Sequence, residues 1–154
     1  MHGVSRLTLQ EDVALISFAK IPCGAGTLSN IFDCFSKYGI NVDMISQSTP
    51  LNNSTNLSLT CPGNAMGQVL KLTRELKLLH PELIPLVVSG SCKISLFGLD
   101  MQNSTGVFAR AVSALCSLPV ELRLVTTSEV DISLLIDSLN SDDAVNALNK
   151  AFCL

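Results

Sequence analysis

Three polar residues lie at even spacings between Ile40 and Gln47: Asn41, Asp43 and Gln47 itself. Successive side chains of an extended strand point to opposite faces, so these three would share one face. On that face Asp43 offers a negative partner for an ammonium group, and the two amides can both donate and accept hydrogen bonds. The pattern suits the solvated side of a half-covered sheet equally well, and both interpretations stay open at this point.

A glycine-containing loop, Cys23–Thr27, lies directly before a helical pattern. Gly24 and Gly26 leave backbone N–H groups uncovered at the start of that helix, where the helix dipole is positive. Such a helix start can hold a carboxylate. The loop and the polar strand together therefore predict complementary features for the two charged ends of a small zwitterion.

Residues for other chemistry are few. The six cysteines form no Cys-x-x-Cys pair, and the only histidines are His2 and His80. Metal sites need closely spaced ligands and catalytic triads need a histidine beside a nucleophile, so we expect no metal, no cofactor and no catalytic residues. Most cysteines are predicted to be reduced and buried, and catalysis through Cys23 is a minor alternative.

The composition narrows the class of partner. Net charge is -3 and the ten basic residues are scattered, which argues against nucleic acid. No apolar run is long enough to span a membrane, and the N-terminus lacks the layout of a signal peptide, so we expect a cytoplasmic protein. Hydrophobic residues make up 47% of the chain and mean hydropathy is +0.43, which predicts that a second copy covers apolar surface in a homodimer.

The chain repeats itself. Two strand-like segments, Val13–Phe18 and Cys92–Phe97, each lead into a loop with a glycine, and Gly26 and Gly106 lie 80 positions apart. Helical periodicity follows each glycine. The segments that come next, 40–47 and 120–127, have the alternation of strands and again start 80 positions apart. In the second of them Val120, Leu122 and Leu124 are expected to form one apolar face.

Each copy continues with a second strand and a second helix, which gives most of a βαββαβ, ferredoxin-like motif. These elements are predicted at 56–60 and 65–79 in the first copy, and at 131–136 and 142–152 in the second. Asn64 is expected to cap the first of these helices, and Asn140 or Ser141 the second.

The last strand distinguishes the copies. The first copy has Leu83–Val88 available, whereas the second ends at Leu154, directly after its helix. The opening segment Gly3–Leu9 is strand-like and would complete the second sheet; the alternative is a loose N-terminal tail. We therefore predict an α+β protein with two ferredoxin-like domains, 13–90 inserted into 1–12 plus 91–154.

Several motifs resemble those of the ACT domains of aspartate kinase. They comprise Gly39-Ile-Asn-Val-Asp-Met-Ile-Ser-Gln47, Ser58-Leu-Thr-Cys-Pro62, Thr127-Ser-Glu-Val-x-Ile-Ser133 and the ending Ala147-Leu-x-x-Ala-Phe-x-Leu154. The resemblance covers almost the whole chain. It implies two ACT domains, one inserted in the other, that correspond to the C-terminal regulatory region without the kinase domain.

The resemblance implies a function in allosteric feedback control rather than catalysis. The expected ligand is an amino acid, threonine or lysine, bound at an interface between ACT domains of two chains, and a kinase catalytic chain is a possible further partner. The implied effector-binding residues are Cys23, Gly24, Ala25, Gly26, Thr27, Asn41, Val42, Asp43 and Gln47.

The first loop departs from the family pattern Asp-x-Pro-Gly. Cys23 replaces the acid and Ala25 replaces the proline. The loop is therefore less charged, and lysine is expected to lose more binding from this change than threonine. A dimerisation module that has lost its effector is the alternative function.

Overall fold

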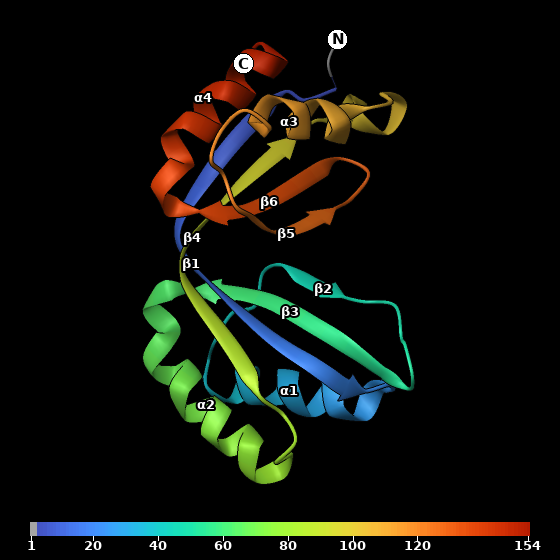
Figure 1. The fold of residues 1–154 in the computed structure, drawn as a ribbon, viewed down its shortest axis with the longest axis vertical. Coiled ribbons are helices and arrows are strands. Elements are labelled where there is room, and N and C mark those ends of the chain that lie inside the picture. Colours follow the sequence, from blue (N-terminus) through green and yellow to red (C-terminus); the bar gives the residue numbers. More distant parts are fainter. Residues whose placement is uncertain (1–2) are drawn as a thin grey trace. The chain divides into compact units, whose positions relative to one another are not determined.

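The computed structural model describes residues 3–154 and divides into two compact units. The central unit runs from Asp12 to Ser89, and the terminal unit combines the residues up to Glu11 with Gly90–Leu154. In each unit two helices cover one face of an antiparallel sheet (Figure 1). The predicted α+β class and the ferredoxin-like arrangement are confirmed.

In the central unit the strands follow the order β2-β3-β1-β4, so β2 forms one edge. Ile31, Cys34 and Phe35 recur at helical spacing on α1 and are buried against the sheet. The helix ends where Gly39 adopts a left-handed φ of 66°. The elements are β1 (Arg6–Pro22), α1 (Ala25–Lys37), β2 (Ile45–Gln47), β3 (Ser54–Pro62), a 3-10 turn (Gly63–Ala65), α2 (Met66–Leu79) and β4 (Pro85–Phe97).

In the terminal unit the order is β1-β4-β6-β5, so β5 forms an edge. The start of the chain belongs to this unit: Val4 is buried in its core, and the Ser5 N–H donates to the Phe97 carbonyl at 2.8 Å. The further elements are a 3-10 helix (Leu99–Asn103), α3 (Val107–Leu115), β5 (Leu122–Thr127), β6 (Asp131–Asp137), a 3-10 turn (Ser138–Asn140) and α4 (Ser141–Phe152).

The strands β1 and β4 are longer than expected. The sequence suggested separate strands at 3–9 and 13–18, and at 83–88 and 92–97, but each pair forms one continuous element. A single residue with positive φ marks the point where each strand passes from one unit to the next, Asp12 at 53° and Gly90 at 67°. The strands continue through both positions, although the sequence pattern is interrupted at each.

The prediction that Val120, Leu122 and Leu124 share one apolar face was wrong. The ladder pairs Leu122 with Ile136 but Leu124 with Leu135, so a bulge lies between them and turns the two leucines to opposite faces. Ile136 belongs to the core under the helices. Leu122 therefore faces the helix side of the sheet.

The expected helix caps were also wrong. Neither α2 nor α4 has a side-chain cap, because each is preceded by a 3-10 turn that continues into the helix. The Asn140 amide instead donates to the Asp137 carboxylate at 2.7 Å and to the Pro119 carbonyl at 2.9 Å. Asn140 thus joins the end of β6 to the loop before β5 and is not available to the helix.

Candidate functional site

The loop between β1 and α1 presents an uncovered helix start. Gly24, the residue before α1, has a φ of 118° and no side chain with which to cap the helix. The first turn of α1 contains no acidic residue. A Cβ on Gly24 or on Gly26 would meet nothing within 4 Å, so open space surrounds both residues. The backbone N–H groups of this turn are accessible to an anion.

The other residues of the loop are accessible as well. Cys23 and Ala25 are exposed and Thr27 is half-buried. The Cys23 N–H donates to the carbonyl of Asn53 at 3.1 Å, which joins the loop to the β2–β3 connection. That bond fixes where the chain leaves β1 and enters the helix.

The predicted polar face is present, but the strand that was expected to carry it is shorter than predicted. Only Ile45–Gln47 forms β2, whereas 40–47 was predicted. The hydroxyl of the buried Thr60 accepts the Met44 N–H at 2.9 Å, while its carbonyl accepts the Asp43 N–H at 3.0 Å. A side chain thus replaces one backbone partner, and the regular ladder stops there.

Exposure nevertheless alternates through this segment. Asn41, Asp43 and Gln47 are exposed, Val42 is half-buried and packs on the core, and Met44 is buried. The three polar residues therefore share the face that the alternation predicted.

The structure does not bring all nine candidate residues together within one chain. The end of β1 pairs Pro22 with Ser54, whereas Asp43 lies opposite Thr60, six residues along β3. Six residues of strand span about 20 Å, which is longer than an amino acid. Gln47 lies opposite Leu57, between these two points, so it is nearer the loop than Asn41 and Asp43 are.

A group of polar residues that the sequence analysis did not select supports the loop. The Thr55 hydroxyl donates to the Ser48 carbonyl at 2.6 Å, and the Asn56 N–H donates to the Ser48 hydroxyl at 2.9 Å. The Asn56 side chain in turn accepts the Lys20 N–H at 2.9 Å, at the bulge near the end of β1. These bonds hold the β2–β3 connection together, and the bond between Asn56 and Lys20 attaches it to β1.

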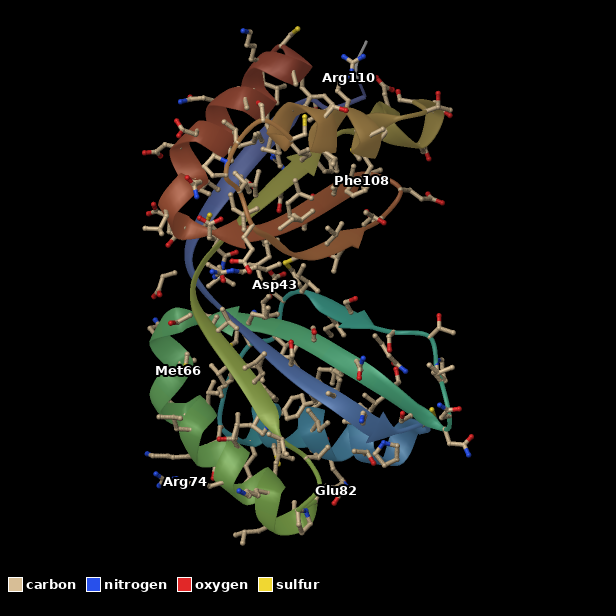
Figure 2. All side chains as sticks on the ribbon, in the orientation of Figure 1. Asp43, Met66, Arg74, Glu82, Phe108 and Arg110 are labelled. Carbon is tan, nitrogen blue, oxygen red and sulfur yellow. The ribbon has the colours of Figure 1, made fainter. Side chains whose placement is uncertain are left out.

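The terminal unit contains an equivalent loop with different surroundings. Gly106 precedes α3 with a left-handed φ of 79°. One face of α3 is apolar: Phe108, labelled in Figure 2, is exposed by 42%, and Val112, one turn further on, by 37%. Beside it lies a cavity of about 130 Å³, lined by Val112, Leu115, Cys116, Val120 and Leu122.

A buried carboxylate, Asp137, anchors the opposite end of the terminal unit. Burial alone would raise its pKa, but the Glu121 N–H at 2.8 Å and the Asn140 amide hold the pKa below its ordinary value. These bonds fix the approach to β5. The group is a structural anchor and not part of the candidate binding surface.

In the part of the chain that the structure describes, no three His, Cys, Asp and Glu side chains are grouped as metal ligands would be. Cys34, Cys61 and Cys92 are buried, while Cys23, Cys116 and Cys153 are exposed, so half of the cysteines depart from the expected burial. Among residues 3–154 no helix has the length and apolar character needed to cross a membrane.

Comparison with known families finds a match in the terminal unit. Residues 94–152, from the second half of β4 to the end of α4, match the family model of the ACT domain. This part of the chain is similar to an ACT domain. The central unit has the same order of strands and helices.

The similarity extends over nearly the whole chain. The regulatory subunit of aspartate kinase from Thermus thermophilus, in a ligand-free form, has a TM-score of 0.88 and 25% identity, covering 97% of this chain and 99% of that one. The aspartokinase of Corynebacterium glutamicum is 30% identical over 100% of this chain, which spans 36% of its length. The chain thus resembles the regulatory portion of aspartate kinases.

A more distant structure shares the fold. E. coli aspartokinase III in complex with lysine and aspartate has a TM-score of 0.77 at 20% identity, covering 97% of this chain and 33% of that one.

Proposed function

We propose that this chain is the amino-acid-sensing regulatory part of an aspartate kinase, and that it binds threonine or lysine at an interface between ACT domains of two chains. The observation that carries the proposal is the share of each similar protein that the chain covers. The chain matches 99% of a regulatory subunit but about a third of a complete aspartokinase, so the shared part is the regulatory part. We further propose that it acts in the cytoplasm on a kinase catalytic chain, whether attached or separate.

The geometry of the central unit favours a site shared between two chains. The uncovered helix start at Gly24 suits a carboxylate, and Asp43 suits an ammonium group. Because these lie about 20 Å apart along the sheet of one chain, one bound amino acid cannot reach both. A second chain that brings its own Asn41–Asp43 segment to the loop of the first would complete the set.

The terminal unit offers a surface for that second chain. Phe108, Val112 and Leu122 expose apolar side chains around the cavity between α3 and the edge strand β5. A single copy in water leaves this surface uncovered, and a homodimer would bury it. An effector held between the central units of such a dimer shifts the protein between dimer arrangements by its different affinity for each.

The test is a thermal-shift screen of the intact chain against all common amino acids, followed by calorimetry. A ligand present at one hundred times its Kd should add about 2.7 kcal/mol of stability, which is several degrees. A shift with threonine or lysine alone supports the proposal. A shift with unrelated amino acids, or with none, contradicts it.

The second candidate function is a dimerisation module without an effector. It is favoured by Cys23, because the loop lacks the carboxylate of the family pattern. A dimer that gains no stability from any amino acid in the same screen would establish it instead.

A further inference from the structure

The outward face of α2 combines cations with leucines. Lys71, Arg74 and Lys77 are exposed there, and Leu70 and Leu78 lie among them, exposed by 55% and 85%. In helical projection the five fall within about one third of the circumference. We call them the α2 basic face; Figure 2 shows Arg74 on the outer side of the helix.

No carboxylate neutralises this face. Glu75, the one acid of α2, is turned toward α1, where it pairs with Lys37 at 2.7 Å and accepts the Tyr38 hydroxyl at 2.9 Å. Within residues 3–154 none of the three cations of the α2 basic face forms an ion pair. Leucines at such exposure among unpaired cations on a helix indicate a contact surface.

The equivalent helix of the terminal unit has the opposite charge. Asp142 and Asp143 are exposed in the first turn of α4, with Asn146 one turn further on. Leu139, one turn before them, is exposed by 93%. We call these four residues the α4 acidic face; in the described chain neither aspartate has a cationic partner.

We propose that the α2 basic face of one chain docks on the α4 acidic face of a second copy. The two faces have opposite charge, and each carries exposed leucine that the other would cover. Both halves of the pair are on the same chain, so a second copy provides all that the contact needs. This surface is separate from the proposed effector loop and from the apolar surface between α3 and β5.

Each ion pair of this contact is exposed and therefore weak, worth a few-fold in affinity, so the pairs act together with the leucines. The contact can close on itself if both faces of each chain are used reciprocally, or can extend as an open chain if they are not. In either case association depends on protein concentration and weakens as salt screens the charges.

The test uses two charge-reversed forms of the full chain. One carries K71E, R74E and K77E and has two acidic faces; the other carries D142K and D143K and has two basic faces. When either form is alone, an α2–α4 contact between two of its copies brings like charges together. Mixed in equal amounts, the two forms restore opposite charges at every contact. All forms also carry V112D, which is expected to weaken association through the apolar surface between α3 and β5.

Sedimentation velocity with one form fluorescently labelled measures the association. We expect the mixture to associate at least about tenfold more tightly than either form alone, and the gain to disappear at high ionic strength. The exposed control substitution Asp33→Lys on α1 should leave association unchanged. If lysines destabilise the start of α4, D142N with D143N provides a milder variant that should weaken self-association of the chain carrying V112D.

Three results overturn the proposal. One is a mixture that associates no more tightly than its components. Another is association of the chain carrying V112D alone that is insensitive to both sets of reversals. The third is binding of the native chain, but not of K71E/R74E/K77E, to vesicles of anionic phospholipid when the mixture shows no gain, which would assign the α2 basic face to a lipid surface.

Discussion

The same two helix positions have different environments in the two units. Leu28 and Phe32 on α1 are partly buried and pack against the core of the central unit. Their counterparts 80 residues later, Phe108 and Val112 on α3, stand exposed outside the core of the terminal unit. The two units thus share a fold but differ at these positions. The terminal unit exposes an apolar surface on α3, whereas the central unit has an accessible helix start at Gly24.

The difference suggests a division of roles. In the terminal unit, exposed apolar side chains and a cavity surround the edge strand β5. In the central unit, the edge strand and loop expose polar side chains and glycines with open space around them, together with the separate apolar residues Ile45 and Leu51. We infer that the terminal unit contributes more to association and the central unit more to ligand recognition.

The largest expected effect concerns the glycine after the core strand. A Cβ on Gly98 would collide with the backbone carbonyl of Gly3, which cannot move without displacing the start of the chain from the terminal unit. Gly98→Ala should therefore destabilise that unit by about 3 kcal/mol or more. Chemical denaturation monitored by circular dichroism measures the change.

Gly67→Ala in α2 is the matched control, because its new Cβ meets nothing within 4 Å. Helix propensity should make that variant slightly more stable, by up to about 1 kcal/mol. Equal destabilisation by both substitutions would show that the close approach of Gly3 to Gly98 has no special role.

Association is the next effect in size. Val112→Asp places a charge beside the apolar cavity next to α3, and should weaken dimer formation by about 2 kcal/mol, or roughly thirtyfold. Ser113→Asp, exposed on the same helix, adds the same charge and should have little effect. Analytical ultracentrifugation over a range of concentrations separates the two; a dimer that tolerates Val112→Asp would move the interface elsewhere.

Much of the fold follows from local patterns, because helix and strand periods are visible in single segments. Ile31 and Phe35 on α1, and the alternation from Asn41 to Gln47, are examples that the structure retains. The bulge between Leu122 and Leu124 was not predictable, because only the pairing with β6 reveals it. Secondary structure was thus accessible where it depends on neighbours in sequence.

The candidate site was harder to predict for the same reason. The loop at Gly24 and the strand face at Asp43 were each recognisable, but their separation depends on the register of β3 between Ser54 and Thr60. The hydrogen bond from the Met44 N–H to the Thr60 hydroxyl likewise depends on tertiary structure. A sequence shows which residues share a face more readily than how far apart two faces lie.

A smaller effect is expected at the effector loop. Cys23→Asp restores the carboxylate of the family pattern beside an exposed helix start. A carboxylate there attracts the side-chain ammonium of lysine, so lysine affinity should rise relative to threonine by about 1 kcal/mol, or roughly fivefold.

Isothermal calorimetry with both amino acids measures that ratio. Thr105→Asp, exposed in the corresponding loop of the terminal unit, is the control and should leave the ratio unchanged. Equal changes for both loops would argue against a ligand site confined to the central unit.

The smallest effect distinguishes the two units by pH. The Glu121 N–H and the Asn140 amide overcome the effect of burial and hold the Asp137 pKa low in the terminal unit. The Lys37 ammonium and the Tyr38 hydroxyl lower the Glu75 pKa in the central unit. A lowered carboxyl pKa stabilises the fold above the ordinary value, about 4, and this stability is lost as pH falls through the folded pKa.

Asp137 is buried, whereas Glu75 pairs with the exposed Lys37 and is screened by solvent. Asp137→Asn should therefore cost about 1 kcal/mol at neutral pH and flatten the decline in stability below pH of about 4. Glu75→Gln should change this pH profile less. Denaturation curves from neutral to acidic pH measure both slopes, and a larger flattening by Glu75→Gln would show that the α1–α2 ion pair, not the anchor of β5, governs acid stability.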